Sequence, residues 1–316
     1  MSSATPNPIK KSTARGSHSR LHFVMLLVTV CWASNIIAGK EALTGFGSLA
    51  LAQLRVLGTA LIYAICFLAT GRMARLRLSP RQWLLMVAGS LSGVTLNQLF
   101  FISGLARSTV AHTGLIVALG PVMVLVIAVL IRLEALTTWK FAGMMISFVG
   151  VGILTVDKAA RGNGEHWMGD LILLAGTAVF AVYTILVKEL ANQYDTLTLN
   201  TLIFLPGAIL MVPFCARAVA ATNWAGLRLE AWWGLAFMIL FGSVVPYVLF
   251  AYALTELAAS RVAAFNYLQP VIASSLGISV LSEKLTTKVL IGGALILAGV
   301  YLTERERGEE GPVETS

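Results

Sequence analysis

Charged side chains are scarce in this sequence. They make up 12% of its 316 residues, while the hydrophobic fraction is 57% and the mean hydropathy is +0.82. Soluble domains carry about 25% charged residues, so a surface this poor in charge would not stay in water. The chain is therefore predicted to be an integral membrane protein. Its net charge of +8 requires no nucleic-acid partner, because basic loops beside an anionic cytoplasmic leaflet account for it.

Cysteine is rare as well. The three cysteines, Cys31, Cys66 and Cys215, lie inside or at the edge of apolar runs, and no CxxC or Cys/His spacing occurs. This pattern suggests neither a disulfide framework nor a metal site, and nothing else in the sequence indicates a cofactor. We expect all three cysteines to be buried packing residues.

Acidic residues are missing from the middle of the long apolar segments. Proton-coupled carriers commonly place an Asp or Glu at such positions. Intramembrane enzymes need clustered His, Asp, Glu or Ser/Lys groups there, and these are missing too. Both classes are therefore disfavoured.

Apolar segments long enough to span a membrane recur along the chain. A bilayer core takes roughly 20 apolar residues as helix, and on that basis we expect ten spans. Residues 1–20 are predicted to be a disordered basic tail, and residues 304–316 a disordered charged tail. The first span is long and lacks a nearby small-residue cleavage site, which favours an uncleaved helix over a signal peptide. The spans lie near 21–39, 48–69, 83–104, 109–131, 139–157, 168–187, 197–216, 232–253, 258–281 and 287–303.

Lysine and arginine are more frequent in the segments on the N-terminal side of these spans than on the other side. The excess comes mainly from the basic head and from the loop that holds Arg72, Arg75, Arg77 and Arg81. By the positive-inside rule, both termini are predicted to be cytoplasmic.

The chain contains an internal duplication. The stretch GPVMVLVIAVLIRLEALTTWKFAGMMISFVGV (120–151) returns 149 residues later as QPVIASSLGISVLSEKLTTKVLIGGALILAGV (269–300). Ten spans divide into two repeats of five, and because five is odd the repeats must cross the membrane in opposite directions. Inverted repeats are a recurrent transporter architecture with the substrate site near the midplane between them. Identical pairs include Pro121 and Pro270, Glu134 and Glu283, Gly143 and Gly292, and Lys40 and Lys188.

These repeated phrases resemble the EamA-type members of the drug/metabolite transporter superfamily. The resemblance rests on CWASNIIAGKEAL (31–43), QLRVLGTAL (53–61), GDLILLAGTAVFAVYTILVKEL (169–190), YLQPV (267–271) and SEKLTTKVLIGGALILAGVYL (282–302). It implies an all-α integral membrane protein with ten transmembrane helices, arranged as one five-helix repeat over 21–157 and an inverted one over 168–303. It also implies an inner-membrane carrier, often an exporter of amino acids or other small metabolites. One departure is Gln269, because relatives often carry an acidic residue before the second proline.

Polar and aromatic residues inside the spans are the best candidates for substrate contact, because polar groups are costly to place in lipid. Asn and Gln offer donors and acceptors without charge, and aromatic rings offer stacking and cation–π faces. Such a lining suits a zwitterionic or polar-aromatic metabolite, while helix–helix hydrogen bonding is the alternative for each residue. The candidates are Trp32, Asn35, Gln53, Arg55, Asn97, Gln98, Phe101, Tyr183, Asn200, Tyr247, Asn266, Tyr267 and Gln269.

Three of the buried positions allow two interpretations each. Arg55 is the one cation within a span, and it could bind a substrate carboxylate or extend its guanidinium to the interface. Pro121 and Pro270 lie deep in their spans and predict kinks near the midplane, either as hinges of a moving pair or as static bends. His112, near the outer start of the fourth span, is the candidate proton site.

The remaining repeated residues are expected to build the frame. Glu134 and Glu283 lie at membrane edges, which favours capping of the following helix over proton transfer. Glycines in the fifth and tenth spans allow close helix approach, and we expect them to join the halves or to form a dimer. They include Gly143, Gly150, Gly292, Gly293 and Gly299.

The sequence thus favours a bacterial inner-membrane carrier of a small molecule, embedded in the lipid bilayer as a monomer or homodimer. It would work by alternating access, as a uniporter or with weak coupling. An intramembrane enzyme and a structural or sensory membrane protein are the alternatives. Substrate contacts are expected where the halves differ, as at Gly120 against Gln269 and Ala118 against Tyr267.

Overall fold

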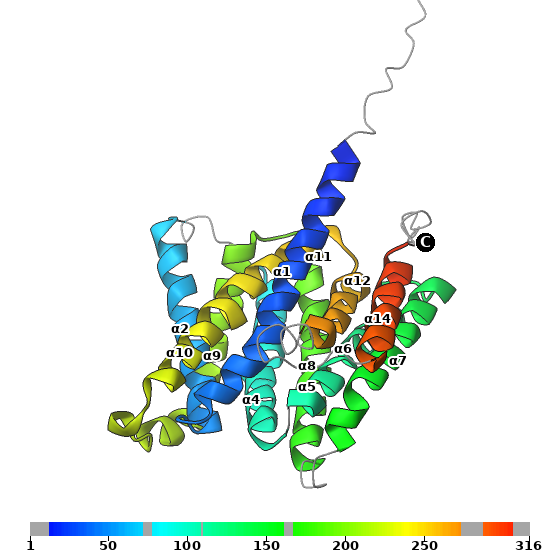
Figure 1. Ribbon diagram of the computed structural model, residues 1–316. Coiled ribbons are helices and arrows are strands. Elements are labelled where there is room, and N and C mark those ends of the chain that lie inside the picture. Colours follow the sequence, from blue (N-terminus) through cyan, green and yellow to red (C-terminus); the bar gives the residue numbers. More distant parts are fainter. Residues whose placement is uncertain (1–12, 72–77, 109, 161–166, 273–286, 306–316) are drawn as a thin grey trace, which may run out of the picture.

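The computed structural model describes residues 13–71, 78–108, 110–160, 167–272 and 287–305, and every regular element among them is helical (Figure 1). Seven of the described segments are long and apolar enough to span a membrane. Two shorter apolar stretches, Thr138–Ile153 and Leu290–Thr303, coincide with the fifth and tenth predicted spans. The ninth predicted span, 258–281, is described only as far as residue 272. The protein is a multi-pass membrane protein.

The first half of the chain contains the first five predicted spans. Its first helix begins inside the tail that was predicted to be disordered, because residues 13–20 continue the helix without a proline or glycine break except Gly16. Its elements are α1 (Thr13–Ala42), α2 (Ser48–Ala69), α3 (Pro80–Gly89), the π-helical segment η2 (Ser90–Leu96), α4 (Asn97–Arg107), α5 (Val110–Val117), α6 (Gly120–Leu130) and α7 (Thr138–Ala160).

The second half repeats this order. Residues 268–272 are helical after η5, and residues 273–286 lie outside the described part, as does Glu283. The elements are α8 (Trp167–Leu190), α9 (Thr196–Ala220), the short turn η3 (Trp224–Gly226), α10 (Leu229–Ile239), the π-helical segment η4 (Leu240–Val244), α11 (Val245–Glu256), α12 (Ala259–Ala264), the 3-10 segment η5 (Phe265–Tyr267) and α14 (Thr287–Arg305).

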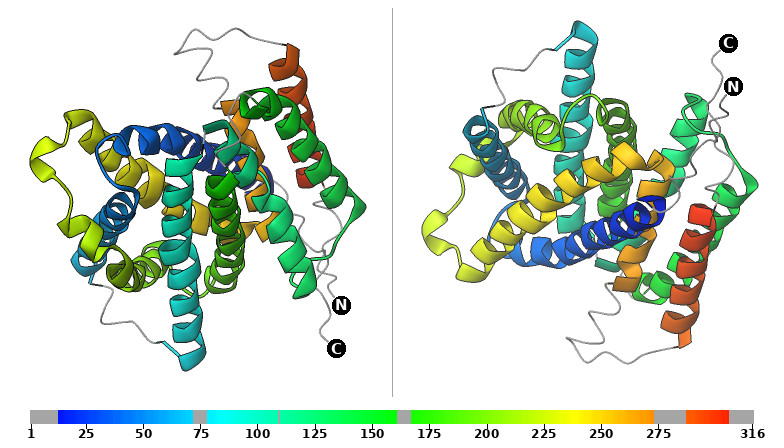
Figure 2. Two further views of the ribbon diagram at one scale, coloured as in Figure 1. Left: turned by 90° about the horizontal axis from the view of Figure 1, so that it is seen from below. Right: turned by 90° about the horizontal axis from the view of Figure 1, so that it is seen from above.

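Corresponding helices of the two halves pack against each other in antiparallel pairs. The clearest pair is α7 with α14, which lie side by side at one edge of the bundle (Figure 2). A Cβ atom added at Gly143 would lie 2.6 Å from the carbonyl oxygen of Gly299, and one added at Gly150 would lie 2.7 Å from that of Gly292. Only glycine permits so close an approach. The glycines therefore join the two halves within one chain, as one of the two interpretations predicted.

A contact between equivalent residues marks the local two-fold axis. The hydroxyl of Ser147 donates to the carbonyl of Ile296 across 3.2 Å, and the two residues are 149 positions apart, as the repeats are. The corresponding helices α2 and α9 also pack on each other, and α6 of the fourth predicted span packs on α12 of the ninth. Helix α1 packs on α10 and α11, while its counterpart α8 packs on α4. This last contact therefore occurs twice with the two halves exchanged, as a two-fold arrangement requires.

Equivalent lysines cap equivalent helices. Lys40, near the end of α1, donates from Nζ to the carbonyl of Ser108 at 2.6 Å, just past the end of α4. Lys188, near the end of α8, donates to the carbonyls of Leu254 and Leu257 at 2.8 Å each, at the end of α11. A cation at a helix C-terminus satisfies free carbonyls and opposes the negative end of the dipole. The duplicated lysines therefore fix the first helix of each half to the third.

One of the three cysteines departs from expectation. Cys31 and Cys215 are buried, but Cys66 is exposed on the outward side of α2. Its neighbours Ile65 and Leu68 are also exposed, at 66% and 59%. An apolar run in a membrane helix places side chains toward lipid as readily as toward protein, so hydropathy alone could not distinguish the two.

Candidate functional site

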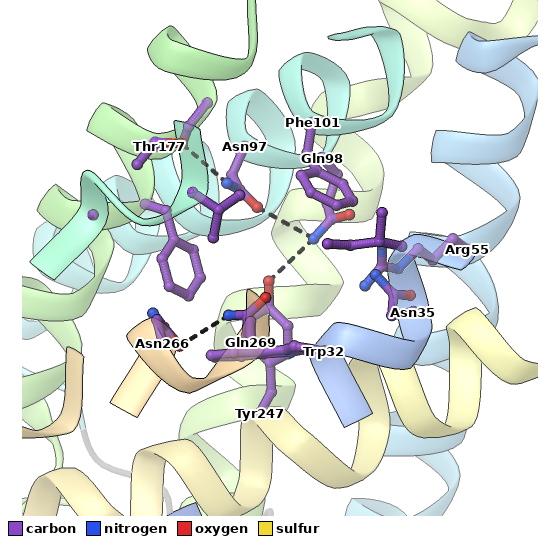
Figure 3. Close-up of a pocket in the computed structure, with 15 residues that line it drawn as sticks. Trp32, Asn35, Arg55, Asn97, Gln98, Phe101, Thr177, Tyr247, Asn266 and Gln269 are labelled. Atoms are coloured by element: carbon purple, nitrogen blue, oxygen red, sulfur yellow. Dashed lines mark hydrogen bonds between the residues drawn. The ribbon is translucent and has the colours of Figure 1, made fainter. Parts of the chain in front are cut away.

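A cavity of about 90 Å³ lies in the middle of the bundle, between the two halves (Figure 3). A buried water needs about 10–15 Å³ measured in this way, so the cavity has room for a small molecule but not for a bulky one. Elements from both halves form its wall. The lining residues are Trp32, Asn35, Ile36, Arg55, Asn97, Gln98, Phe101, Val117, Gly120, Gly176, Thr177, Phe180, Tyr247, Asn266 and Gln269.

Arg55 is buried against the π-helical segment η4. Its guanidinium donates from Nε to the hydroxyl of Ser243 at 2.9 Å and from Nη2 to the carbonyl of Gly242 at 2.8 Å. The wider turn of a π-helix shifts the hydrogen-bonding pattern of the helix, and η4 offers a carbonyl here to a side chain. Residue Arg55 is 2% exposed, so the alternative of an arginine extended to the membrane interface is wrong.

The third nitrogen of that guanidinium has no partner. Nη1 of Arg55 is buried without a hydrogen bond, and among the described residues no carboxylate pairs with the cation. A buried charge without a counter-ion is costly, and removing one partner of such a pair is strongly destabilising. The cavity therefore contains a cationic donor that no group of the described chain neutralises.

Amide side chains connect the two halves across the cavity. Asn97 donates from Nδ2 to the carbonyl of Gly176 at 3.0 Å, and Gln98 donates from Nε2 to the hydroxyl of Tyr247 at 3.0 Å (Figure 3). These bonds use the donors. The acceptors Oε1 of Gln98 and Oδ1 of Asn35 are buried without partners. Two unpaired acceptors thus belong to residues that line the same cavity as Arg55.

Aromatic rings close the cavity on one side. We call the N-terminal face the face of the bundle at which α1 begins and α11 and α14 end (Figure 1). The ring of Trp32 lies 5.2 Å from that of Phe250 and 5.7 Å from that of Phe180, between centroids. Phe250 is fully buried and lies one turn beyond Tyr247 toward the end of α11. The rings therefore separate the cavity from the N-terminal face.

Each proline follows a break in its helix. Pro121 lies in the first turn of α6, after the interruption between α5 and α6, and Pro270 follows the 3-10 segment η5. Both helices are thus interrupted beside their prolines, while the midplane position and movement about the breaks stay predictions. The breaks present Gly120 and Gln269 to the cavity, and Gln269 donates to Oδ1 of Asn266 at 3.2 Å.

Four candidate residues do not line the cavity. Gln53 donates to the carbonyl of Ala208 at 3.2 Å, which is helix–helix bonding between α2 and α9. The ring of Tyr183 lies against Gly93, and Tyr267 is fully buried. Asn200 likewise bonds to backbone carbonyls of residues 196 and 247. The side chain of His112 lies outside the described residues, so its role stays a prediction.

Other lining residues were not predicted from the sequence. Phe180 is the repeat counterpart of Trp32, and that correspondence could have placed it at the cavity. Gly176 and Thr177 precede it by one turn of α8 and contribute a carbonyl and a small side chain. No signal in the sequence distinguished these small residues from those that only pack. No group of three or more metal-binding side chains occurs within the described ranges.

Comparisons with known proteins agree with this architecture. A family model described as the EamA-like transporter family matches residues 20–156 and again 167–305. An uncharacterized transporter of Archaeoglobus fulgidus is 30% identical over 90% of this chain and 98% of its own length. A probable terminal-alkyne amino-acid exporter of Streptantibioticus cattleyicolor is 25% identical over 91% of this chain and 94% of its own length. A crystal structure of a protein with 18% identity superposes with a TM-score of 0.72, covering 90% of this chain and 97% of that one, which shows the shared fold.

Proposed function

Because the chain belongs to the EamA-like transporter family, we propose that this membrane transporter carries small zwitterionic metabolites, amino acids among them. The observation that carries the proposal is Arg55, which lines the cavity and whose buried Nη1 has no hydrogen-bond partner. A substrate carboxylate supplies the missing counter-charge, and a guanidinium recognises a carboxylate well through its fixed donors.

The rest of the cavity suits the opposite end of the same substrate. The free acceptors of Asn35 and Gln98 can receive hydrogen bonds from an ammonium group. The rings of Trp32, Phe180 and Tyr247 offer faces to a cation or to an apolar side chain. A molecule with a carboxylate at one end and an ammonium at the other satisfies donor and acceptors together.

We further propose transport by alternating access between two inverted repeats of five membrane-spanning helices each. The antiparallel contacts of α7 with α14 and the helix breaks at Pro121 and Pro270 support this arrangement. The lysine and arginine bias supports cytoplasmic termini in a bacterial inner membrane. Export is the favoured direction, because one relative is named as a probable amino-acid exporter. An enzyme or a purely structural protein would not require the free polar groups at the cavity.

The decisive experiment is counterflow in proteoliposomes. We expect radiolabelled L-amino acids to exchange, and the corresponding amines without a carboxylate not to exchange. The Arg55→Met variant should lose about tenfold or more of this flux, because a hydrogen bond to a charged group contributes about 1.5–3 kcal/mol. Arg55→Lys should retain part of it, since the charge remains while the fork is lost.

The matched control is Arg81→Met, which removes an exposed arginine whose partner is Glu189 at the surface. It should leave the flux unchanged. Size-exclusion chromatography and thermal unfolding report whether each variant is folded. Amines that exchange as fast as amino acids, or full flux in a folded Arg55→Met protein, would contradict the proposal.

A further inference from the structure

The position of Glu134 in the sequence suggested that this residue caps the helix that follows it. In the structure it does not. Helix α6 ends with Arg132 in a left-handed conformation, at a φ of 58°. The backbone N–H groups of Leu133 and Glu134 both donate to the carbonyl of Ala128, at 2.8 and 3.3 Å. This tight turn directs the Glu134 side chain back into the protein, where it is 6% exposed.

The carboxylate of Glu134 binds the start of α12, in the other half of the chain. Its Oε1 accepts from the backbone N–H of Ser260 at 3.0 Å, and its Oε2 accepts from the hydroxyl of the same serine. Lys140, 1% exposed, balances the charge from 3.3 Å. The following helix is capped instead by Thr137, whose hydroxyl accepts from the backbone N–H of Lys140 at 3.3 Å.

This contact joins the two helices that are interrupted at the cavity. α6 and the segment from α12 to residue 272 hold the two prolines and present Gly120 and Gln269 to the cavity. They pack on each other, and Glu134 fastens them at the N-terminal face. The aromatic rings that separate the cavity from this face lie on the same side. An opening toward the N-terminal face must part these helix ends.

We infer that the contact between Glu134 and Ser260, hereafter the latch, closes the cavity at the N-terminal face and breaks when the cavity opens there. The inference rests on the alternating access proposed above. Both of its hydrogen bonds involve a charged acceptor, which makes them about twice as strong as neutral ones. Lys140 belongs to the same half as Glu134, so the ion pair can persist while the latch opens.

The duplication makes the latch unequal on the two faces. The repeat counterpart of Glu134 is Glu283, and the counterpart of Ser260 is Ala111, both 149 residues away. Alanine has no hydroxyl, so the repeated sequence offers no second serine hydroxyl for such a bond. We therefore expect the resting protein to favour the state that is closed at the N-terminal face.

The test measures access to the cavity rather than transport. A single reporter, Val117→Cys, is introduced at the cavity after Cys31, Cys66 and Cys215 are replaced by alanine. A membrane-impermeant methanethiosulfonate reagent is then applied to each face in vesicles of both orientations. In the parent protein, labelling should be faster from the face opposite the N-terminal face.

Ser260→Ala should raise the labelling rate from the N-terminal face about tenfold, because one hydrogen bond to a charged acceptor is lost. The double variant Glu134→Gln with Lys140→Met should raise it as well, without leaving a lone buried charge. Ala111→Ser should act oppositely and slow labelling from the face opposite the N-terminal face. Thr255→Ala is the matched control, since its hydroxyl binds only the carbonyl of Tyr252 within α11.

The outcomes distinguish failure of the latch hypothesis from failure of the alternating-access hypothesis. If the parent is labelled from one face only and neither Ser260→Ala nor the double variant changes the rates, the latch is wrong while alternating access survives. Equal labelling of the parent from both faces would overturn one-sided closure and the proposed transport mechanism with it. Thermal unfolding verifies that each variant is folded, and Ala111→Ser keeps the test valid because it adds a hydroxyl rather than removing one.

Discussion

At the scale of single residues, the buried charged side chains differ in whether their polar atoms have hydrogen-bond partners and a counter-charge. Arg55 has two hydrogen bonds to η4 and one free nitrogen, whereas Lys140 and Glu134 neutralise each other. All three side chains are buried, yet of these three only Arg55 lines the cavity, and no carboxylate among the described residues pairs with it. Its unmet hydrogen-bonding capacity, and not its burial, makes it the group that we propose to meet the substrate.

Arg132 offers a direct test of backbone strain. It is the described non-glycine residue with a positive φ, and it closes α6 in the position where glycine is preferred. Arg132→Gly should raise the free energy of unfolding by about 1 kcal/mol, because glycine removes the left-handed penalty. The thermal unfolding midpoint in detergent measures the gain. Arg132→Ala retains a Cβ and should show no such gain; equal midpoints for the glycine and alanine variants would contradict the explanation.

Substitution of Gly93, in η2, tests the packing next to the cavity. A Cβ atom at this position would lie 2.0 Å from Cδ2 of Tyr183, so the ring or the helix must shift. Gly93→Ala should cost about 1–3 kcal/mol of stability, as overpacking does in other cores. Gly114 has nothing within 4 Å of its hypothetical Cβ, and Gly114→Ala should be neutral or stabilising. A fully stable Gly93→Ala protein would show that Tyr183 is free to move.

At the scale of helices, the π-helical segments limit what periodicity can predict. η2 and η4 each place extra backbone within the third helix of their half, and this rotates the face that the following residues present. Asn97 and Tyr247 reach the cavity from just beyond these segments. On the regular helix α8, Phe180 lines the cavity, but Tyr183, nearly one turn later, lies against Gly93. A single sequence could not fix which side of α8 faces inward.

The pairing of α7 with α14 depends on its glycines. A large side chain at Gly150 would meet the carbonyl of Gly292 and the side chain of Ile296, whereas Gly152 has nothing within 4 Å. Gly150→Leu should therefore lower the thermal midpoint and the folded yield, while Gly152→Leu should leave both almost unchanged. Fluorescence-detected size exclusion with a temperature ramp measures both quantities. Equal behaviour of the two variants would mean that the close helix contact does not stabilise the protein.

At the scale of the whole molecule, the sequence predicted the architecture better than the site. Hydropathy predicted the seven long apolar helices and the two shorter ones because membrane helices must be long and apolar, and the repeated Pro, Gly and Glu revealed the duplication. Nine of the thirteen candidates surround one cavity, while Gln53, Tyr183, Asn200 and Tyr267 do not line it. The partner of Glu134 could not be predicted, because α12 is distant in sequence and nothing local indicates the contact.

The distribution of acidic groups leads to a prediction about energy coupling. No Asp or Glu of the described residues lines the cavity. A substrate held by Arg55, as proposed, would therefore have no carboxylate from these residues with which to exchange a proton. Counterflow of an amino acid should proceed at the same rate with and without a pH gradient, as the uniport interpretation predicts. The measurement uses proteoliposomes with a proton ionophore as the control, and a several-fold acceleration by the gradient would contradict it.

The positions of the two π-helical segments also indicate whether the irregular turn or the duplication is older. η2 covers residues 90–96, and η4 covers residues 240–244, which correspond to 91–95 after subtraction of the repeat length of 149. If each half had acquired its insertion independently, both insertions would have had to occur at the equivalent helical turn. A single insertion in a half-length ancestor explains both, so the irregular turn is older than the duplication. At the same repeat length of 149, the counterpart of Arg55 is Phe204, on the helix that packs against η2. This difference arose later, when one chain already held both halves.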